Sequence, residues 1–218
     1  MTVAAAILCP DAETALRPID GRPLVRRVAE AAWSGGAVPV IVVAREPDVR
    51  IAEALAGASV IVASAGAGGL TSPLAQLEAA LDAAREEVAG TSAILAWPVR
   101  MAWVDPESVT SLIEAHGAGP GRILRPAFGG QRGWPVLLPA ERIADLGPAG
   151  DTDDLDLALA ALDGSPGARV VDLGDPGAIH DLATPREALP PYEAPPGPMS
   201  GATYEWGAAG TDDPATTD

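Results

Sequence analysis

Residues 93–109 read AILAWPVRMAWVDPESV, and this stretch predicts a buried strand that leads through a short loop into a helix. The apolar run Ala93–Trp97 has the length of a strand that is covered on both faces. Asp105 precedes a proline and a glutamate, an order typical of a helix start with Asp105 as N-cap. Val109 and Leu112 continue the helix at helical spacing.

The first half of the chain has the same alternation of strand and helix. Apolar runs of strand length are separated by amphipathic stretches of helix length, which is the pattern of a mostly parallel sheet covered by helices. We therefore expect an α/β fold, with a Rossmann-like sheet flanked by helices. The predicted strands are Val3–Leu8, Val38–Ala44 and Ser59–Ala63, and the predicted helices are Pro23–Gly35, Val49–Ala56 and Ser72–Val88, the last with Ser72 as N-cap.

The second half changes character. Two apolar runs flank a glycine-rich turn at residues 128–133, which predicts a hairpin or a strand pair with a long loop. A helix, a last strand and a short terminal helix follow; the spacing Thr184-Pro185-Arg186-Glu187 is that of a capping box. These predicted elements are strands at Arg122–Pro126, Trp134–Leu138 and Arg169–Leu173, and helices over Asp153–Leu162 and from Thr184.

Composition divides the chain into a domain at residues 1–189 and a tail at residues 190–218. The tail is rich in Pro, Gly, Ala, Thr and Asp, so we expect it to be disordered. It nevertheless contains Tyr192, Tyr204 and Trp206. Aromatic residues in a segment without a core are typical of a peptide that docks onto a protein partner, but a plain spacer or packing on the same domain fits equally well.

Charge and cysteine content exclude several classes of function. The net charge is −16 and all 14 basic residues are arginine, so nucleic acid and anionic membrane surfaces are expected to be repelled. The one cysteine, Cys9, excludes an internal disulfide and a cysteine-rich metal site. Because the sequence shows no signal peptide and no apolar run of membrane-spanning length, we expect a cytoplasmic protein.

Several stretches, taken in order, resemble the MobA-like nucleotidyltransferases, and among them the branch that attaches cytidylate to the molybdenum cofactor. The resemblance covers roughly residues 3–189 and implies a fold of the nucleotide-diphospho-sugar transferase type. The resemblance also implies the reaction of that family, which is Mg²⁺-dependent transfer of a nucleotide to an acceptor. The stretches are LRPIDGRPLV at 16–25, GLTSPL at 69–74, PVRMAWVDPESV at 98–109, GGQRGWPV at 129–136 and DLATPRE at 181–187.

Residues that match the family's motifs are the candidate site. The resemblance assigns Arg100 and Asp181 to the catalytic positions, with Asp181 as a weak metal ligand, and gives the other candidates a role in binding a nucleotide or a pterin-like molecule. The substrate-binding candidates are Gly69, Ser72, Gly130, Arg132, Gly133 and His180.

The departures from the family pattern affect the positions that would bind the metal ion and the triphosphate. Arg100 stands where the family has a metal-binding aspartate, and Ala183 where it has a second acid, so Mg²⁺ would meet a like charge. The loop at residues 9–14 is short, acidic and free of glycine, which does not suit a triphosphate. We therefore expect a catalytically degenerate protein without a cofactor that acts by binding a ligand or partner.

Two other functions remain open from the sequence. An active nucleotidyltransferase with a divergent site would keep Mg²⁺ as cofactor, with Asp181 as metal ligand and Arg100 stabilising phosphate charge directly. An accessory or assembly subunit would use the acidic tail to contact another enzyme. Nucleotide binding that strengthens with Mg²⁺ would distinguish an active nucleotidyltransferase from a degenerate protein. Loss of a bound partner on deleting residues 190–218 would identify an accessory subunit.

Each candidate residue also has a structural interpretation. For Arg100 we favour an ion pair with Asp105, Asp181 or Glu107, and for His180 a bond to a neighbouring carboxylate. Gly129 and Gly130 need no ligand, because they suit a hairpin turn.

Two further features also favour structural roles. Cys9 ends a buried strand and is expected to be an inert packing residue. The acidic cluster at residues 151–156 lacks the glycine and glutamate of an EF-hand loop, so a charged helix start is favoured over a calcium site.

Overall fold

An eight-stranded sheet and a small two-stranded sheet form the framework of the computed structural model, which describes residues 2–44, 47–64, 72–151, 155–160 and 167–193. The large sheet contains β1 (Thr2–Cys9), β4 (Val40–Ala44), β5 (Val60–Ser64), β6 (Thr91–Pro98), β7 (Ile123–Phe128), β8 (Gln131–Arg132), β9 (Val136–Pro139) and β10 (Ala168–Asp172); the small one contains β2 (Pro18–Ile19) and β3 (Arg22–Pro23). The helices are α1 (Ala12–Leu16), α2 (Leu24–Ser34), α3 (Val49–Ala54), α4 (Pro73–Glu87), α5 (Pro106–Ala118) and α6 (Leu155–Ala160), with 3-10 helices η1 (Ala140–Asp151), η2 (Pro176–Ala178) and η3 (Arg186–Ala188).

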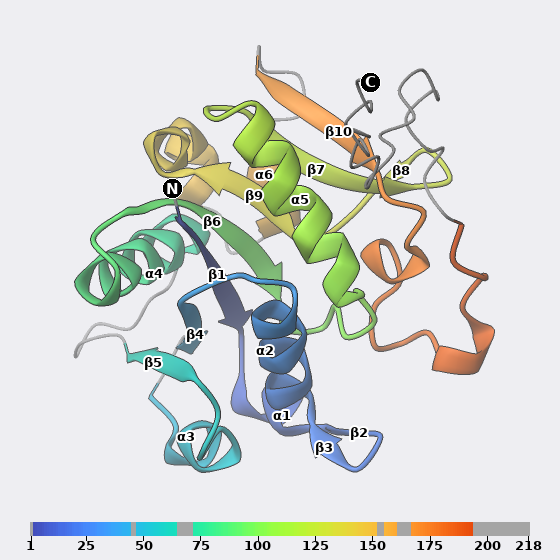
Figure 1. The fold of residues 1–218 in the computed structure, drawn as a ribbon. Coiled ribbons are helices and arrows are strands. Elements are labelled where there is room, and N and C mark those ends of the chain that lie inside the picture. The colour runs from blue at the N-terminus through green and yellow to red at the C-terminus, as the bar shows by residue number, and fades with distance from the viewer. Residues whose placement is uncertain (1, 45–46, 65–71, 152–154, 161–166, 194–218) are drawn as a thin grey trace, which may run out of the picture.

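The strands follow the order β10-β7-β9-β6-β1-β4-β5, and β8 pairs with β7 (Figure 1). Strands β5, β4, β1 and β6 are parallel, as is β10 to β7, whereas β9 is antiparallel to both β6 and β7. The prediction of an α/β fold with a mostly parallel sheet is confirmed. The predicted strand pair is also present as β7 and β9, with the short strand β8 folded back onto β7 between them.

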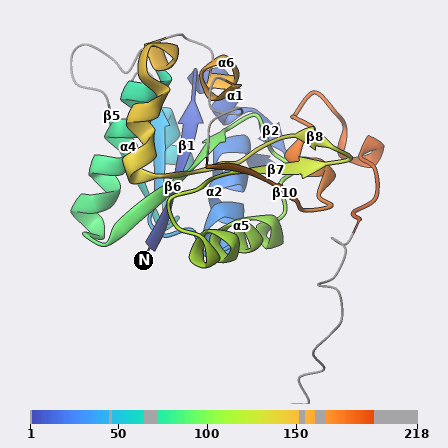
Figure 2. The same cartoon turned by 90° about the horizontal axis from the view of Figure 1, so that it is seen from above.

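Helices cover both faces of the sheet. The helices α2 and α5 pack together on one face, whereas α4 and η1 pack together on the other, with α6 against η1 (Figures 1 and 2). Gly35 ends α2, and a Cβ there would lie 2.4 Å from the Cβ of Val109 in α5. The predicted helix-ending glycine therefore also lets two helices approach closely. None of the helices in the described residues is long and apolar enough to cross a membrane.

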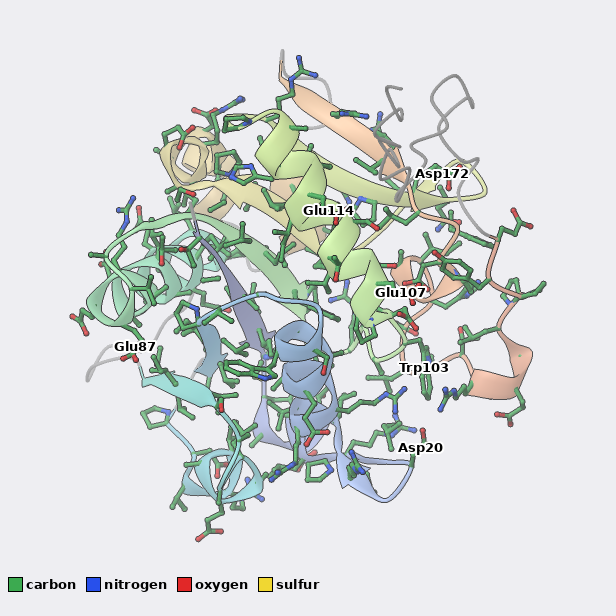
Figure 3. All side chains as sticks on the ribbon, viewed as in Figure 1. Asp20, Glu87, Trp103, Glu107, Glu114 and Asp172 are labelled. Atoms are coloured by element: carbon green, nitrogen blue, oxygen red, sulfur yellow. The ribbon has the colours of Figure 1, made fainter. Side chains whose placement is uncertain are left out.

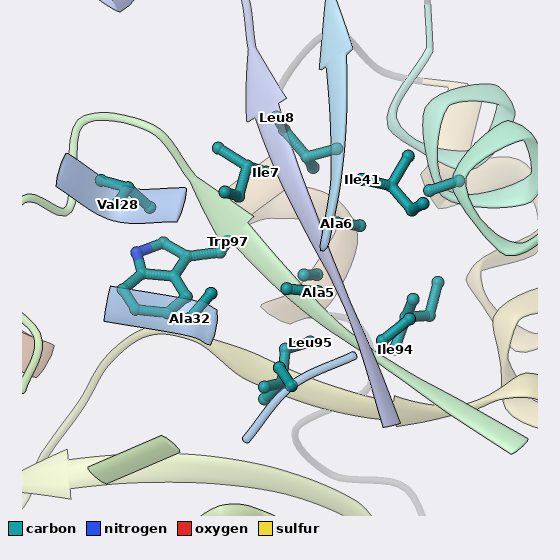
Figure 4. Packing of buried hydrophobic residues seen from close by; sticks show 14 of the residues in the cluster. Ala5, Ala6, Ile7, Leu8, Val28, Ala32, Ile41, Ile94, Leu95 and Trp97 are labelled. Atoms are coloured by element: carbon teal, nitrogen blue, oxygen red, sulfur yellow. The ribbon is translucent and has the colours of Figure 1, made fainter. Parts of the chain in front are cut away.

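The core is built around β1 and β6. Residues Ala4–Ala6 of β1 are fully buried, and their small side chains let neighbouring layers pack closely. Trp97 of β6 is also fully buried and donates its indole N–H to the carbonyl of Met101 at 3.0 Å. Its ring lies on the side of α2, beside Val28 and Ala32 (Figure 4). Truncating such a core aromatic to alanine costs about 3–5 kcal/mol.

Two predicted helix starts are confirmed at the level of hydrogen bonds. The Ser72 hydroxyl accepts the backbone N–H of Ala75 at 3.2 Å, and Asp105 accepts that of Glu107 at 2.9 Å. Each bond satisfies one N–H that the first helical turn leaves without a partner. Asp105 thereby fixes where the chain leaves the loop that follows β6.

The predicted capping box at Thr184 is wrong. The segment forms a single 3-10 turn, η3, whose N-cap is Pro185 without any side-chain bond. Thr184 is engaged elsewhere, because its carbonyl accepts the indole N–H of Trp103 at 3.0 Å and its hydroxyl faces Nδ1 of His180 at 3.5 Å. Of the predicted helix at residues 153–162, the structure describes α6, and both ends of the prediction lie outside the described residues.

Candidate functional site

The carboxyl ends of β1, β4 and β6 meet at one edge of the sheet. In open α/β sheets ligands bind at this edge, where neighbouring connections run to opposite sides. Here β1 connects through α2 to β4, and α5 follows β6 on its way to β7. The described residues form two hollows at this edge, one beyond β1 and β4 and one beyond β6.

The first hollow, which we call the β1 hollow, has a volume of about 440 Å³. Its lining includes Cys9, Asp11, Glu13, Asp48 and Arg50. Asp11 caps α1, because its carboxylate accepts the Thr14 backbone N–H at 2.6 Å and hydroxyl at 3.0 Å. The N–H that could have faced a phosphate is therefore bonded to the protein's own carboxylate.

Acids outnumber bases among the described residues that line the β1 hollow. Three of the described lining residues are acids, and Arg50 binds one of them, Asp48, at 2.7 Å. Hydrogen bonds from Arg50 lower the pKa of Asp48, which keeps that carboxylate ionised. An anionic ligand would thus meet net negative charge.

Cys9 is buried at the end of β1, which supports its interpretation as a packing residue. It is 1% exposed, and burial raises the pKa of its thiol to about 12, with a smaller contribution from Asp11. A thiol with that pKa is almost fully protonated near neutral pH, so it is neither a nucleophile nor a metal ligand there.

The second hollow, the β6 hollow, has a volume of about 320 Å³ and brings together most of the predicted site. Strand β6 supplies the chain that leads to Arg100, the β8–β9 connection supplies one wall, and the chain after η2 supplies another. Its lining includes Arg100, Arg132, Gly133, His180 and Asp181 from the predicted residues, together with Trp134 and Asp156.

Arg100 is paired with an acid that the sequence did not single out. Its Nη2 lies 2.5 Å from Oδ2 of Asp156 in α6, so the predicted partners Asp105, Asp181 and Glu107 are wrong. The pair joins residues 56 positions apart in the chain, and local spacing gives no sign of it. The other oxygen of Asp156 accepts the indole N–H of Trp134 at 3.0 Å.

Trp134 forms an aromatic wall of the β6 hollow. It is 4% exposed, and the guanidinium groups of Arg100 and Arg125 lie 5.9 and 5.8 Å from the centre of its ring. Both distances fall within the range of cation–π attraction. The indole N–H is therefore held in place by packing as well as by its bond to Asp156.

Backbone contacts fix the opposite wall. Trp103 donates its indole N–H to the carbonyls of Asp181 at 3.1 Å and Thr184 at 3.0 Å, and the Leu182 N–H binds the carbonyl of Arg100 at 2.9 Å. The Asp181 carboxylate accepts the Ala183 N–H at 2.9 Å. The partner found for Nδ1 of His180 is the Thr184 hydroxyl, in place of the predicted carboxylate.

The remaining predicted residues lie apart from the β6 hollow or support it. Ser72 caps α4 and does not line the hollow, and Gly69 lies outside the described residues. Gly130 has a φ of +81° in the turn between β7 and β8, which supports its interpretation as hairpin chemistry. Gly133 has no space for a side chain, since a Cβ would lie 2.1 Å from the carbonyl oxygen of Ala178.

A third hollow, of about 450 Å³, lies on the flank beside α2, and its arginines serve structural pairs. Asp20, at the tip of the β2–β3 hairpin, accepts from Arg27 at 3.2 Å and from Arg186 at 3.4 Å. Arg27 also lies 5.1 Å from the Trp103 ring centre. Figure 3 shows Asp20 and Trp103 on the same side of the molecule. These contacts link the β2–β3 hairpin to α2 and to η3.

The side chains at the site do not fit a divalent metal ion. Arg100 places a cation at the end of β6, and the Asp181 carboxylate is turned to a backbone N–H. Among the described residues there is no group of three or more His, Cys, Asp or Glu side chains that could hold a metal ion. Of the acidic cluster, Asp156 binds Arg100 and Trp134, whereas residues 152–154 lie outside the described residues.

Comparison with known proteins places this geometry in a family. Residues 12–166 match the MobA-like NTP transferase domain. Members of that family typically depend on a divalent metal ion. A search among curated proteins found no match.

Solved structures share the fold at low sequence identity. A nucleotidyl transferase from Methanothermobacter is 20% identical with a TM-score of 0.63, over 78% of this chain and 87% of that one. Rv0371c from Mycobacterium tuberculosis, in complex with manganese, is 12% identical with a TM-score of 0.62, over 87% and 98%. A CMP-2-keto-3-deoxy-manno-octonic acid synthetase with CTP is 12% identical with a TM-score of 0.58, over 84% and 95%.

Proposed function

The chain belongs to the MobA-like NTP transferase family, and from this premise we propose that it binds a small anionic molecule in the β6 hollow without metal-dependent nucleotidyl transfer. The observation that carries the proposal is the Arg100 guanidinium, held by Asp156 where the family's motif has a metal-binding carboxylate. A nucleotide or a pterin-like compound is the candidate ligand, by resemblance to the family.

Loss of transfer follows from the charges at the carboxyl edge. Nucleotidyl transfer releases pyrophosphate, and its transition state needs positive charge around the phosphates. In the family a bound divalent metal ion supplies part of that charge. Here Arg100 excludes the ion by repulsion, and the β1 hollow adds the carboxylates of Asp11 and Glu13.

Retention of binding is supported by the β6 hollow. Arg100 and Arg132 bring guanidinium groups to its lining, and an arginine can form two parallel bonds to a phosphate or carboxylate. The Trp134 indole adds a donor that does not depend on pH. Because Gly133 and Trp103 fix both walls through backbone contacts, these groups are positioned before a ligand arrives.

Calorimetric titration with CTP, GTP and ATP, each with and without Mg²⁺, tests the proposal. We expect any binding to be unaffected by Mg²⁺, and we expect no pyrophosphate release with candidate acceptors. Binding that strengthens with Mg²⁺, together with pyrophosphate release, would show that the protein is an active nucleotidyltransferase.

Restoring the acids of the family's motif at positions 100 and 183 provides an independent test. The double variant Arg100→Asp, Ala183→Asp restores both acids of the family's motif, and Arg100→Gln is the matched control that removes the same cation without adding a ligand. We expect Mn²⁺ binding by calorimetry in the double variant only. Equal Mn²⁺ affinity in the unmodified protein would contradict the proposal.

A further inference from the structure

Two donors of the β6 hollow converge on one carboxylate. Oδ2 of Asp156 accepts from Arg100 at 2.5 Å, and Oδ1 accepts from the Trp134 indole at 3.0 Å. A guanidinium and a neutral N–H that bind the two oxygens of one group form a recognition pattern for an oxyanion. The same pair would suit a terminal phosphate or carboxylate of a ligand.

Contacts that do not involve Asp156 hold the backbone at both donors. The carbonyl of Arg100 accepts the N–H of Leu182 at 2.9 Å, and the N–H of Trp134 binds the carbonyl of Ala178 at 2.8 Å. Trp134 is also nearly buried. These backbone bonds and the 5.9 Å contact between the Arg100 guanidinium and the Trp134 ring remain available when the carboxylate leaves.

The carboxylate itself is accessible to solutes. The Asp156 side chain is 52% exposed, and that of Arg100 is 37% exposed. A pair with this exposure is screened by solvent and worth little, so a dissolved anion can compete with it. Asp156 is thus the more exposed partner of an ion pair that lines the hollow.

Charge in the hollow also depends on Asp156. Among the described residues, the lining contains two arginines, Arg100 and Arg132, and two aspartates, Asp156 and Asp181. The formal charges of these four side chains cancel while the Asp156 carboxylate lies in the hollow. When its carboxylate turns away, the lining has a net positive charge and attracts an anion.

We infer that Asp156 is an internal competitor that occupies the place of a ligand's oxyanion on Arg100 and Trp134. A ligand with a terminal phosphate or carboxylate binds by displacing this carboxylate, and Asp156 thereby lowers the affinity of the site. This inference rests on the proposed ligand binding in the β6 hollow. It adds the class of group that is recognised and the residue that regulates access.

The test is a titration with inorganic phosphate at constant ionic strength, followed by the indole N–H resonance of Trp134 in nuclear magnetic resonance spectra. Trp134→Phe assigns that resonance. The full-length chain is compared with Asp156→Asn and with Asp82→Asn, an exposed aspartate on α4 that serves as the matched loss of one negative charge. Arg100→Gln removes the main donor.

We expect the phosphate concentration at half-saturation to fall about three- to fivefold in Asp156→Asn, the upper part of the range for losing a competing exposed ion pair. It should change less than about twofold in Asp82→Asn, because salt screens a distant surface charge. In Arg100→Gln the phosphate response should be lost.

Each contrary outcome has a distinct meaning. If Asp156→Asn and the unmodified protein bind phosphate equally, the competitor role is overturned while ligand binding stands. If Asp82→Asn matches Asp156→Asn, net charge explains the gain and the inference fails. If neither the unmodified protein nor Asp156→Asn responds to phosphate, oxyanion recognition in this hollow is wrong, and the nucleotide titration alone then decides the proposed function.

Discussion

The β1 hollow and the β6 hollow lie at the same edge of the same sheet, yet their polar groups are used differently. In the β1 hollow, acids dominate and Asp11 satisfies the start of α1. In the β6 hollow, Arg100 and Trp134 converge on a carboxylate that a ligand could replace. The strand ends of one sheet thus support an acid-lined hollow at β1 and, at β6, a hollow in which two donors meet a carboxylate.

Strand packing explains why the fold persists. The edge is defined by β1, β4 and β6, whose buried residues other than Thr91 are apolar and whose register is set by backbone pairing. Side chains just beyond the strand ends are free to change without disturbing that packing. An arginine in place of an acid at position 100 therefore alters the site and leaves the sheet intact.

The largest expected effect concerns Cys9 in the β1 hollow. With a pKa of about 12, its thiolate fraction at pH 8 should be about a thousandfold below that of the unfolded chain. Alkylation by iodoacetamide, followed by mass spectrometry with and without urea, measures this ratio. Fast alkylation of the folded protein would mean that the β1 hollow holds a reactive group.

Cys9 also predicts the direction of a pH effect on stability. Its folded-state pKa lies above the unfolded value, so its contribution is fully present below the unfolded pKa. The contribution is lost as the pH rises from there towards about 12. Cys9→Ala should remove that alkaline dependence in urea unfolding at successive pH values.

The next largest effect concerns the wall of the β6 hollow. Trp134→Ala should lower the free energy of unfolding by about 3–5 kcal/mol, because it removes a nearly buried indole. Trp33, which is 48% exposed, is the matched control, and Trp33→Ala should cost less than about 1 kcal/mol. Similar urea midpoints for the two variants would show that Trp134 does not support the hollow through packing.

A smaller effect is expected at Gly133. The variant Gly133→Ala should destabilise the protein by about 2–3 kcal/mol, because its Cβ would collide with the carbonyl oxygen of Ala178. Gly90 has open space around it, so Gly90→Ala should stay within about 0.5 kcal/mol of the unmodified protein. Thermal unfolding of both variants provides the measurement, and a neutral Gly133→Ala would argue against a rigid wall.

The smallest effect belongs to the β1 hollow. Asp11→Ala removes the N-cap of α1 and should cost about 1 kcal/mol in urea unfolding. Asp105→Ala, which removes the cap of the longer helix α5, should cost a similar amount. A gain of stability in Asp11→Ala would mean that repulsion among the acids of the hollow destabilises the protein by more than the N-cap stabilises it.

Much of the fold was predictable because its signals are local. The order Asp105-Pro106-Glu107 marks the start of α5, and Ser72-Pro73 marks that of α4. The alternation of apolar runs gave the parallel part of the sheet correctly. The position of β9 between β6 and β7 is a matter of long-range pairing, and no local pattern indicates it.

For the candidate site, the sequence indicated several of the residues but not the contacts between their side chains. The motif matches selected Arg100, Arg132 and His180, and these three residues line one hollow. They did not identify Asp156 as the partner of Arg100, because α6 reaches the hollow through tertiary packing. The only sign in the sequence was that Asp156 belongs to a run of acids in a segment next to the site.

Asp175 links the chain after β10 to the start of α5. Its carboxylate, 3% exposed, accepts the N–H of Asp105 at 2.9 Å and the hydroxyl of Ser108 at 2.7 Å. It lies beyond residue 166, where the family match stops. A fragment cut at that boundary would lose this anchor for α5 and also β10, leaving the outer side of β7 as an open strand edge. Such an edge templates aggregation, so a minimal expression fragment has to extend past η2.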